Sequence, residues 1–264
     1  MGNAVNIVTW NVNSVRQRLP HLLAFLKDVS PDVLGLQEIK CQDEAFPRAE
    51  IEELGYNVAT HGQKTFNGVA LLTKAPCEIL RGLPGEAADE HARTIEGVIS
   101  TKSGALRIVN VYFPNGNPAP GEKYSYKLRF MDRMIARAEA LLELEEPLVI
   151  MGDYNIIPEA VDAAHPEQWT NDALFLPQTR AKYRELLALG FTEAVRAIDA
   201  TPGLYTFWDY QAGAWPRNDG IRIDHHLLSP QAADRLVSTH VYKDMRAAEK
   251  ASDHVPVGIV LDVD

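Results

Sequence analysis

The sequence predicts an α/β fold, a four-layer α/β sandwich in which two mixed β-sheets pack face to face with helices outside. Short apolar runs rich in valine and isoleucine recur along the whole chain and are bounded by turn-forming residues, which is typical of buried strands. Segments with helical periodicity lie between some of these runs. No linker rich in glycine, proline or serine divides the chain, so we expect a single domain over residues 1–264.

The apolar runs predict strands, and three periodic segments predict helices. Strands are expected at residues 5–10, 33–36, 69–73, 93–100, 106–112, 148–151, 221–228 and 255–261. The first helix is expected to begin after Ser14, a suitable N-cap, and to carry a stripe of leucines as far as residue 28. A longer helix is expected at 123–144 and a third at 179–189, where Gly190 is a natural stop. Residues 114–121 (PNGNPAPG) are expected to form a surface loop.

The composition is that of an ordinary globular protein, with 46% hydrophobic residues among 264. A formal net charge of -10 argues against a protein that coats nucleic acid non-specifically, but it allows a local basic groove or a carboxylate metal site. Cys41 and Cys77 lie far apart in the sequence and predict reduced thiols. The sequence shows no export signal and no apolar run of membrane length, so we expect a cytoplasmic protein without membrane contact.

Polar side chains follow the predicted strands at six places. In LVIMGDYNIIP, Leu148 to Pro158, a buried run ends in an acidic and an amide side chain on the same side of the strand. One such cluster is as easily explained by a turn, since both side chains bond local backbone. Six clusters at strand ends predict one shared site. They are Asn11 with Asn13, Gln37 with Glu38, Tyr112 with Asn115, Asp153 with Asn155, Asp224, and Asp253 with His254.

These residue types predict a reaction class. The carboxylate of Glu38, with amides from Asn11 and Asn13, suits Mg²⁺ or Mn²⁺, whereas zinc is disfavoured because paired cysteines and a His-x-x-x-His arrangement are missing. His254, oriented by Asp224, can hold or accept a proton near neutral pH.

Tyr112 offers a hydroxyl donor to an anionic oxygen. Because the set contains no serine or cysteine nucleophile with its own base, direct attack by water is expected. The residues therefore predict metal-assisted hydrolysis of a phosphate ester.

In this order the clusters closely resemble the exonuclease III family of apurinic/apyrimidinic (AP) endonucleases, within the deoxyribonuclease-I-like superfamily. The resemblance spans nearly the whole chain, through TWNVNSVR, PDVLGLQEIK, GYNVATHGQKTFNGVALLTK, NVYFPNG, MGDYNIIP, YTFWDYQAGAWPRNDGIRIDHHLLS and KASDHVPV. GDYN and SDH are shared with phosphatases of the superfamily. LGLQE, HGQK…GVALL and the Trp- and Tyr-rich loop before RID point more narrowly to DNA repair.

The resemblance implies roles for the clustered residues. The implied metal ligands are Glu38, Asn11, Asp253, Asp153, Asn155 and His254, for one or two Mg²⁺ ions with Mn²⁺ as a substitute. Asp153 would orient or deprotonate the attacking water and Asn155 would position it. Asp224 would hold His254 against a phosphate oxygen, which Tyr112 would also contact. Whether Asp153, His254 or an ionised Tyr112 is the base stays open.

The resemblance also implies DNA contacts. The expected DNA-contacting residues are Asn13, Asn115, Phe207, Trp208, Ile221 and Arg222. Three of these residues would form a pocket for a flipped-out sugar that is too tight for a base, namely Phe207, Trp208 and Ile221. Packing in the core explains the two aromatic residues nearly as well. Other basic side chains could contact phosphates or be solvated surface charges; they are Lys64, Arg93 and Lys127.

Three features depart from the family pattern. Asn13 stands where some members have aspartate, and the loop after Tyr112 lacks the arginine that some members insert into the duplex. His225 and His226 are adjacent where apolar residues are commoner. His226 falls on the same side of its strand as Asp224, and we expect both histidines to be hydrogen-bonded and partly buried.

The expected function is an Mg²⁺-dependent DNA repair nuclease that cuts 5′ to abasic sites and has 3′–5′ exonuclease and 3′-end-cleaning activity on double-stranded DNA in base excision repair. We expect it to act as a monomer. Two alternatives stay open: a phosphatase or phosphodiesterase acting on a small or lipid phosphoester, and a DNA-binding module without activity.

Overall fold

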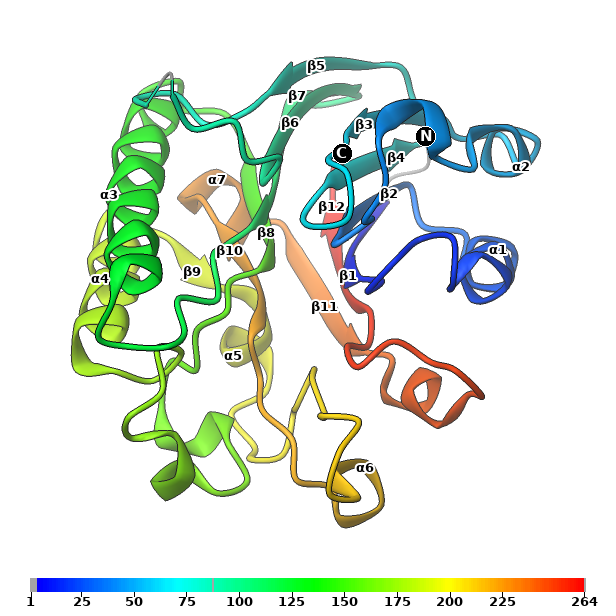
Figure 1. The fold of residues 1–264 in the computed structure, drawn as a ribbon. Coiled ribbons are helices and arrows are strands. Elements are labelled where there is room, and N and C mark those ends of the chain that lie inside the picture. The colour runs from blue at the N-terminus through cyan, green and yellow to red at the C-terminus, as the bar shows by residue number, and fades with distance from the viewer. Residues whose placement is uncertain (1–3, 87, 264) are drawn as a thin grey trace.

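The computed structural model describes residues 4–86 and 88–263, and within them twelve strands form two six-stranded sheets packed face to face (Figure 1). In spatial order, the first sheet consists of β11 (Leu236–Val241), β12 (Val257–Asp262), β1 (Ala4–Asn11), β2 (Val33–Gln37), β4 (Val69–Thr73) and β3 (Asn57–His61). The second consists of β5 (Cys77–Arg81), β6 (Thr94–Thr101), β7 (Gly104–Tyr112), β8 (Leu148–Asp153), β10 (Asp224–Leu228) and β9 (Thr192–Glu193). Both sheets are mixed, because β1–β2 and β7–β8 are parallel pairs.

Helices cover the outer faces of both sheets (Figure 1). Beside the first sheet lie α1 (Leu19–Asp28) and α2 (Arg48–Glu52), and beside the second lie α3 (Glu122–Leu142) and α4 (Pro177–Ala188). The shorter helices are α5 (Ala194–Ile198), α6 (Ala214–Arg217), α7 (Pro230–Ala233) and the 3₁₀ segments Asp43–Ala45, Ala160–Asp162, Pro166–Trp169 and Lys243–Ala247. The predicted four-layer sandwich is therefore confirmed.

Alternating burial divides the apolar residues of each strand between two faces. The inner faces of both sheets meet in one cluster that includes Ile7, Leu71 and Met151. On the outside, Leu22 of α1 packs against the first sheet and Met134 of α3 packs against the second. This packing holds both sheets rigidly against each other, so the ends of their strands form one rim.

The element boundaries differ from the prediction in two informative places. The first helix begins at Leu19, because Ser14 has φ 84° and its side chain does not cap the helix; Pro20 lies in the first turn instead. The run expected at 221–228 is a strand only from Asp224, while Ile221 forms isolated bridges with Ala163 and Phe207. No helix in the described ranges is long and apolar enough to cross a membrane.

Candidate active site

The strand register brings three of the predicted residues into one row. Tyr112 at the end of β7 is paired with Asp153 at the end of β8, and Asp153 is paired with Asp224 at the start of β10. Paired residues in neighbouring strands point to the same side of a sheet. The row therefore lies on the inner face of the second sheet, where it meets the end of β1.

The backbone next to this row requires a glycine. Gly152 has φ 151°, and a Cβ at this position would lie 1.8 Å from the carbonyl oxygen of Val111. The close approach of β7 and β8 therefore allows no side chain at the residue before Asp153. The chain then turns at Asn155, which has φ 49°, a conformation that asparagine tolerates better than most residues.

Three candidate metal ligands converge at this rim. Among the described residues, ligand atoms of Glu38, Asp153 and His254 lie within 4.8 Å of one another. Asn11 links the two carboxylates, because its Nδ2 donates to Glu38 Oε1 and to Asp153 Oδ2, both at 2.9 Å. Lys40 Nζ lies 2.9 Å from Glu38 Oε2. The arrangement concentrates carboxylate oxygens around a point that a cation could occupy.

His254 is held between two aspartates. Its Nδ1 lies 2.9 Å from Asp224 Oδ2, and its Nε2 lies 3.7 Å from Asp153 Oδ2. Thr206 Oγ1 donates to the same Asp224 oxygen at 2.6 Å. Burial opposes the charged imidazolium, but Asp224 and Asp153 outweigh it and raise the pKa of His254 to about 10. The ring is therefore a cation at neutral pH.

The other site groups are tuned by burial and by neighbouring charges. Burial, reinforced by the charge of Asp224, raises the pKa of Asp153 to about 7. Burial would raise the pKa of Glu38, but Lys40 and the amide of Asn11 lower it below its ordinary value. Burial and then the nearby carboxylates raise the pKa of Tyr112 well above its ordinary value, so its hydroxyl stays protonated.

Asn155 orients the carboxylate of Asp153. Its backbone N–H donates to Asp153 Oδ1 at 2.8 Å, and its Nδ2 donates to the carbonyl of Phe113 at 2.9 Å. Asn115 Nδ2 donates to Asn155 Oδ1 at 3.4 Å, so this predicted DNA contact also lies at the rim. These bonds join the loops that follow β7 and β8.

Asp253 and Asn13 form a neighbouring pair, and Asp253 does not belong to the cluster of ligand atoms found in the described ranges. Asn13 Nδ2 donates to Asp253 Oδ1 at 3.2 Å, and Lys40 Nζ donates to Asn13 Oδ1 at 2.5 Å. Asn11 also uses its side-chain oxygen, which accepts from the Asn13 N–H at 3.0 Å. Metal binding by Asn11 and Asp253 therefore stays a prediction.

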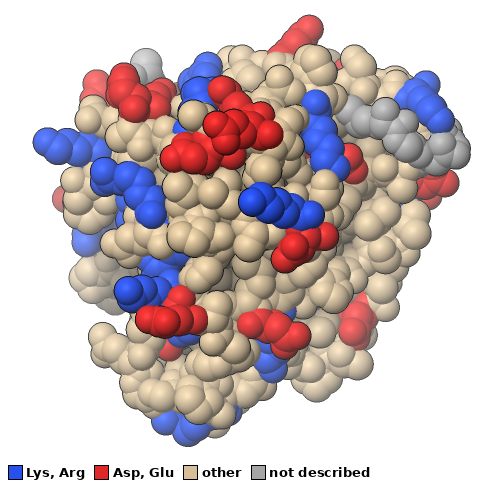
Figure 2. Space-filling model, turned by 90° about the vertical axis from the view of Figure 1, so that its right-hand side faces the viewer, with Lys and Arg blue, Asp and Glu red and all other residues tan. Residues whose placement is uncertain are grey.

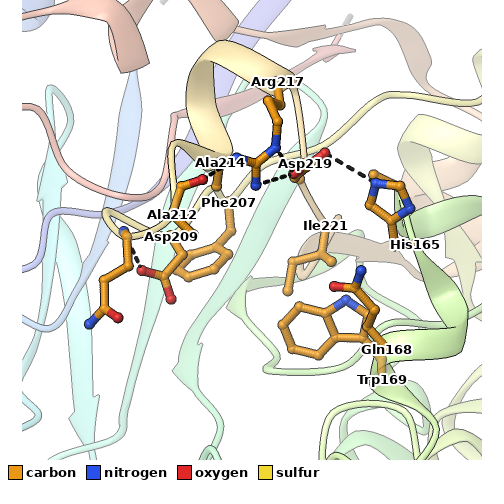
Figure 3. Close-up of a pocket in the computed structure, with 13 residues that line it drawn as sticks. His165, Gln168, Trp169, Phe207, Asp209, Ala212, Ala214, Arg217, Asp219 and Ile221 are labelled. Atoms are coloured by element: carbon orange, nitrogen blue, oxygen red, sulfur yellow. Dashed lines mark hydrogen bonds and ion pairs between the residues drawn. The ribbon is translucent and has the colours of Figure 1, made fainter.

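A pocket of about 300 Å³ is lined by residues of two segments, 164–169 and 207–221 (Figure 3). Phe207 and Ile221 contribute to its walls, as predicted, and the Phe207 ring lies 5.0 Å from the ring of His254. Trp169, from the 3₁₀ segment Pro166–Trp169, lines the pocket as well and was missed by the sequence reasoning. The only signal for it was an aromatic residue in an otherwise polar stretch, PEQWTND.

The comparisons with known proteins agree on one family. Residues 8–254 match the Endonuclease/Exonuclease/phosphatase family. The chain is 38% identical to exodeoxyribonuclease III of Haemophilus influenzae, over 96% of this chain and 98% of that protein. It belongs to the exonuclease III family. It is also 28% identical to an exodeoxyribonuclease of Bacillus subtilis, over 98% of this chain and 100% of that protein.

Solved structures agree with this family assignment. An AP endonuclease from Archaeoglobus fulgidus is 36% identical with a TM-score of 0.93, over 98% of this chain and 100% of that one. A 3′-5′ exonuclease (NExo) from Neisseria meningitidis is 35% identical with a TM-score of 0.94, over the same shares of both chains. As a member of the exonuclease III family, this protein is a metal-dependent phosphodiesterase, and its acidic cluster can hold a metal ion.

In this exonuclease III family member, two predicted DNA contacts are wrong. Trp208 is fully buried, and its Nε1 donates to Asn218 Oδ1 at 3.2 Å, so it supports the pocket from behind and does not line it. Arg222 is 1% exposed and pairs with Asp162 at 2.7 Å and Glu193 at 3.1 Å. A guanidinium that is buried between two carboxylates cannot reach a phosphate.

Two other predictions also need correction. Lys127 is fully buried, and its Nζ donates to the carbonyls of Asn115 and Asn155, at 3.1 and 2.5 Å. It therefore ties the two rim loops together and is no surface charge. His226 is fully buried, with neither ring nitrogen hydrogen-bonded, whereas a hydrogen-bonded ring was expected. His225 does have the expected partners.

Proposed function

We propose that this protein is a DNA repair nuclease that uses Mg²⁺ to hydrolyse the phosphodiester bond 5′ to abasic sites in double-stranded DNA. We further propose that it removes 3′-terminal nucleotides and 3′ blocks, and that it works as a monomer in the cytoplasm in base excision repair. The observation that carries the proposal is the convergence of Glu38, Asp153 and His254 beside a pocket lined by Phe207. The relatives support it: the Neisseria 3′ phosphatase NExo, whose structure is known bound to a product DNA hairpin, is 34% identical to this chain.

The residues present fit a hard divalent cation. Glu38 and Asp153 offer carboxylate oxygens, the ligands that Mg²⁺ prefers, and Mn²⁺ accepts the same set. Burial disfavours the charged form of Asp153 and raises its pKa to about 7, so a bound cation would stabilise this carboxylate. Glu38 and Asp153 would hold one ion, with Asn11, Asn155 and Asp253 as further candidates for one ion or two. His254 was also expected as a ligand, but a ring that holds both protons has no free nitrogen to bind a metal. When bound, Mg²⁺ supplies charge stabilisation to the phosphate, worth several kcal/mol in a transition state.

The chain's own groups divide the proton chemistry between them. His254 has a pKa raised to about 10 by the two aspartates, so it holds its proton and donates a hydrogen bond to a non-bridging phosphate oxygen. The hydroxyl of Tyr112 can serve as a second donor. Asp153, whose Oδ2 lies 3.7 Å from His254 Nε2, is the remaining group that can accept a proton from the attacking water. Asn155 fixes the direction of the Asp153 carboxylate.

The pocket would receive the flipped-out abasic sugar. Phe207, Ile221 and Trp169 give it apolar walls next to His254, so a sugar placed there would bring its 5′ phosphate to the acidic cluster. Flipping an abasic site costs little, because no base has to be unstacked.

The duplex would be held by basic residues around the rim. Arg16, Lys40 and Lys64 line one hollow next to the site, and Arg93 and Lys123 line another beside Tyr112. On the side of the molecule where α1 and α2 lie, acidic and basic side chains are interspersed (Figure 2). We therefore place the DNA contacts at the rim and not over the side that carries α1 and α2.

One assay tests this proposal against its alternatives. Purified protein with Mg²⁺ is incubated with a duplex carrying a single abasic site, with an intact duplex and with an inositol phosphate. We expect incision 5′ to the abasic site and slower loss of 3′ nucleotides from the intact duplex. Cleavage of the inositol phosphate alone would identify a small-molecule phosphatase, and tight duplex binding without any cleavage would identify a binding module.

A further inference from the structure

His226 is a buried polar group that the proposed mechanism does not use. Its side chain is fully buried, yet neither Nδ1 nor Nε2 has a hydrogen-bond partner. Burial lowers the pKa of His226 to about 3, so the ring is neutral and carries one donor and one acceptor nitrogen. Leaving a buried donor or acceptor unpaired is costly, so such a group in a folded protein requires an explanation.

The position of His226 in β10 points to its partner. His226 is paired with Met151 of β8, which packs in the cluster between the two sheets, so its ring also points between them. Alternation along a strand places Asp224, two residues earlier, on the same face. His226 therefore lies directly behind the carboxylate that holds His254.

Asp224 has a matching unpaired atom. Its Oδ2 accepts from Thr206 and contacts His254 Nδ1, whereas its Oδ1 is buried and has no hydrogen-bond partner. The side chain is fully buried, so bulk water does not reach this oxygen. The same face of β10 thus carries an unpaired carboxylate oxygen and, two residues on, an imidazole that can donate.

The adjacent histidine shows what an ordinary structural role looks like in this strand. His225 points to the opposite face, where its Nδ1 lies 3.1 Å from Arg222 and its Nε2 lies 3.0 Å from the carbonyl of Ile156. Tyr154 and Tyr183 pack against its ring. Its hydrogen-bonding capacity is used within the fold, in contrast to that of His226.

We propose that His226 is a positioning residue for the Asp224–His254 pair, and that it donates a hydrogen bond to Asp224 Oδ1 through one water molecule bound between the sheets. Side chains two residues apart on a strand are separated by about 6.6 Å, which exceeds a direct hydrogen bond but suits a single bridging water. A buried water needs at least two polar partners, and these two atoms supply them.

The bridge would fix the orientation of a carboxylate that touches the catalytic histidine. With Oδ1 bonded, Asp224 keeps Oδ2 directed at His254, which in turn faces Asp153. At metal sites, removing a hydrogen-bond partner that orients a site residue typically lowers activity by about 10–100-fold. The inference rests on the proposed function only for the choice of substrate in the assay.

His226→Leu removes the hydrogen-bond donor and replaces it with an apolar side chain of similar size. We expect kcat on the abasic duplex to fall about tenfold or more with little change in KM, because substrate contacts are intact. His226→Gln retains an N–H donor and should recover most of kcat. As a matched control, His225→Leu should lower Tm through the loss of its contacts with Ile156 and Arg222, while kcat of the folded enzyme stays within about threefold of the wild type.

Two results of the activity assay would overturn the inference. One is a His226→Leu protein that is as active as the wild type and more stable, as expected if the imidazole is simply unpaired. The other is a loss of kcat that Gln does not restore. If the wild type itself fails to cut abasic DNA, the proposed function fails, and this inference is then judged on a crystal structure of the wild type. That structure should show an ordered water within hydrogen-bonding distance of His226 and Asp224 Oδ1; no such water would end the proposal.

Discussion

At the scale of single residues, the site works by giving similar groups different environments. Asp153 and Glu38 are both carboxylates at the rim, yet burial raises the pKa of Asp153 while Lys40 helps to lower that of Glu38. His254 lies between two aspartates and becomes a cation. Ligand atoms of all three residues lie within 4.8 Å of one another, and we propose that the carboxylates hold the metal ion while His254 donates a hydrogen bond to the phosphate.

Asp153→Asn is the direct test of this division of roles. The amide keeps the shape of the side chain but cannot accept a proton from water, so we expect kcat to fall by roughly 10²–10⁴-fold. Circular dichroism should show an unchanged fold. Asp132→Asn is the matched control, because Asp132 is an exposed carboxylate of α3 that pairs with Lys182 away from the site, and it should cost far less. A wild-type rate in Asp153→Asn would remove this residue from the mechanism.

At the scale of elements, the site depends on how closely β7 and β8 approach. Gly152 lies where a Cβ would come within 1.8 Å of Val111 O, and the next residue along the chain is Asp153. Lys127 of α3 then ties the following loops together through the carbonyls of Asn115 and Asn155. Strand ends, turn and helix thus fix the position of the Asp153 carboxylate jointly.

Gly152→Ala should disrupt this element. Because the new methyl group meets backbone in a rigid parallel pair, we expect the free energy of unfolding to fall by about 3 kcal/mol or more, measured by urea denaturation. Gly104→Ala is the control, since Gly104 also has a positive φ, 119°, but a Cβ there would meet nothing within 4 Å. It should cost only about 1–2 kcal/mol. Equal losses in both variants would show that the contact with Val111 is unimportant.

At the scale of the whole molecule, the sandwich tolerates two neutral histidines in its interior. Burial lowers the pKa of both His225 and His226 from 6.5 to about 3. Unfolding lets each ring bind a proton below pH 6.5, so their contribution to stability is present at neutral pH and is lost as the pH falls from 6.5 toward 3. The pKa of Asp153 is raised in the folded protein, so Asp153 makes the protein more stable as the pH falls from 7 to 4.

Replacing one of these histidines isolates its contribution to the pH dependence of the free energy of unfolding. We expect the stability of the wild type to fall more steeply between pH 6 and 4 than that of His226→Leu, by about 1.4 kcal/mol per pH unit, since one proton fewer is taken up on unfolding. Urea denaturation at several pH values measures the slopes. Parallel slopes would mean that His226 is not neutral in the folded protein.

Much of the architecture can be predicted from the sequence, because buried strands and amphipathic helices carry their periodicity locally. The strands missed by the sequence analysis were β3, β5, β9 and β11, which border the sheets or are half exposed and so lack a continuous apolar run. The start of α1 was also displaced, because a serine in a left-handed conformation resembles an N-cap in sequence.

The structure brings the polar residues at the strand ends together, as expected. The burial of other residues expected to contact DNA could not be predicted from the sequence. Arg222 and Lys127 look like phosphate contacts in sequence, yet their partners are carboxylates and carbonyls from distant segments. Trp208 and Phe207 are neighbours that point to opposite sides, one into a core cluster and one toward the pocket. Period-2 alternation could have separated these two once the isolated bridges of Phe207 with Ile221 and His254 were known.

The central claim is that Glu38 and Asp153 share one divalent cation next to His254. A crystal of the wild type soaked in Mn²⁺ tests it most directly, because the ion can be located by anomalous scattering independently of activity. We expect a peak with oxygens of Glu38 and Asp153 at roughly 2.0–2.4 Å. A peak elsewhere on the molecule, with these two carboxylates uncoordinated, would contradict the account.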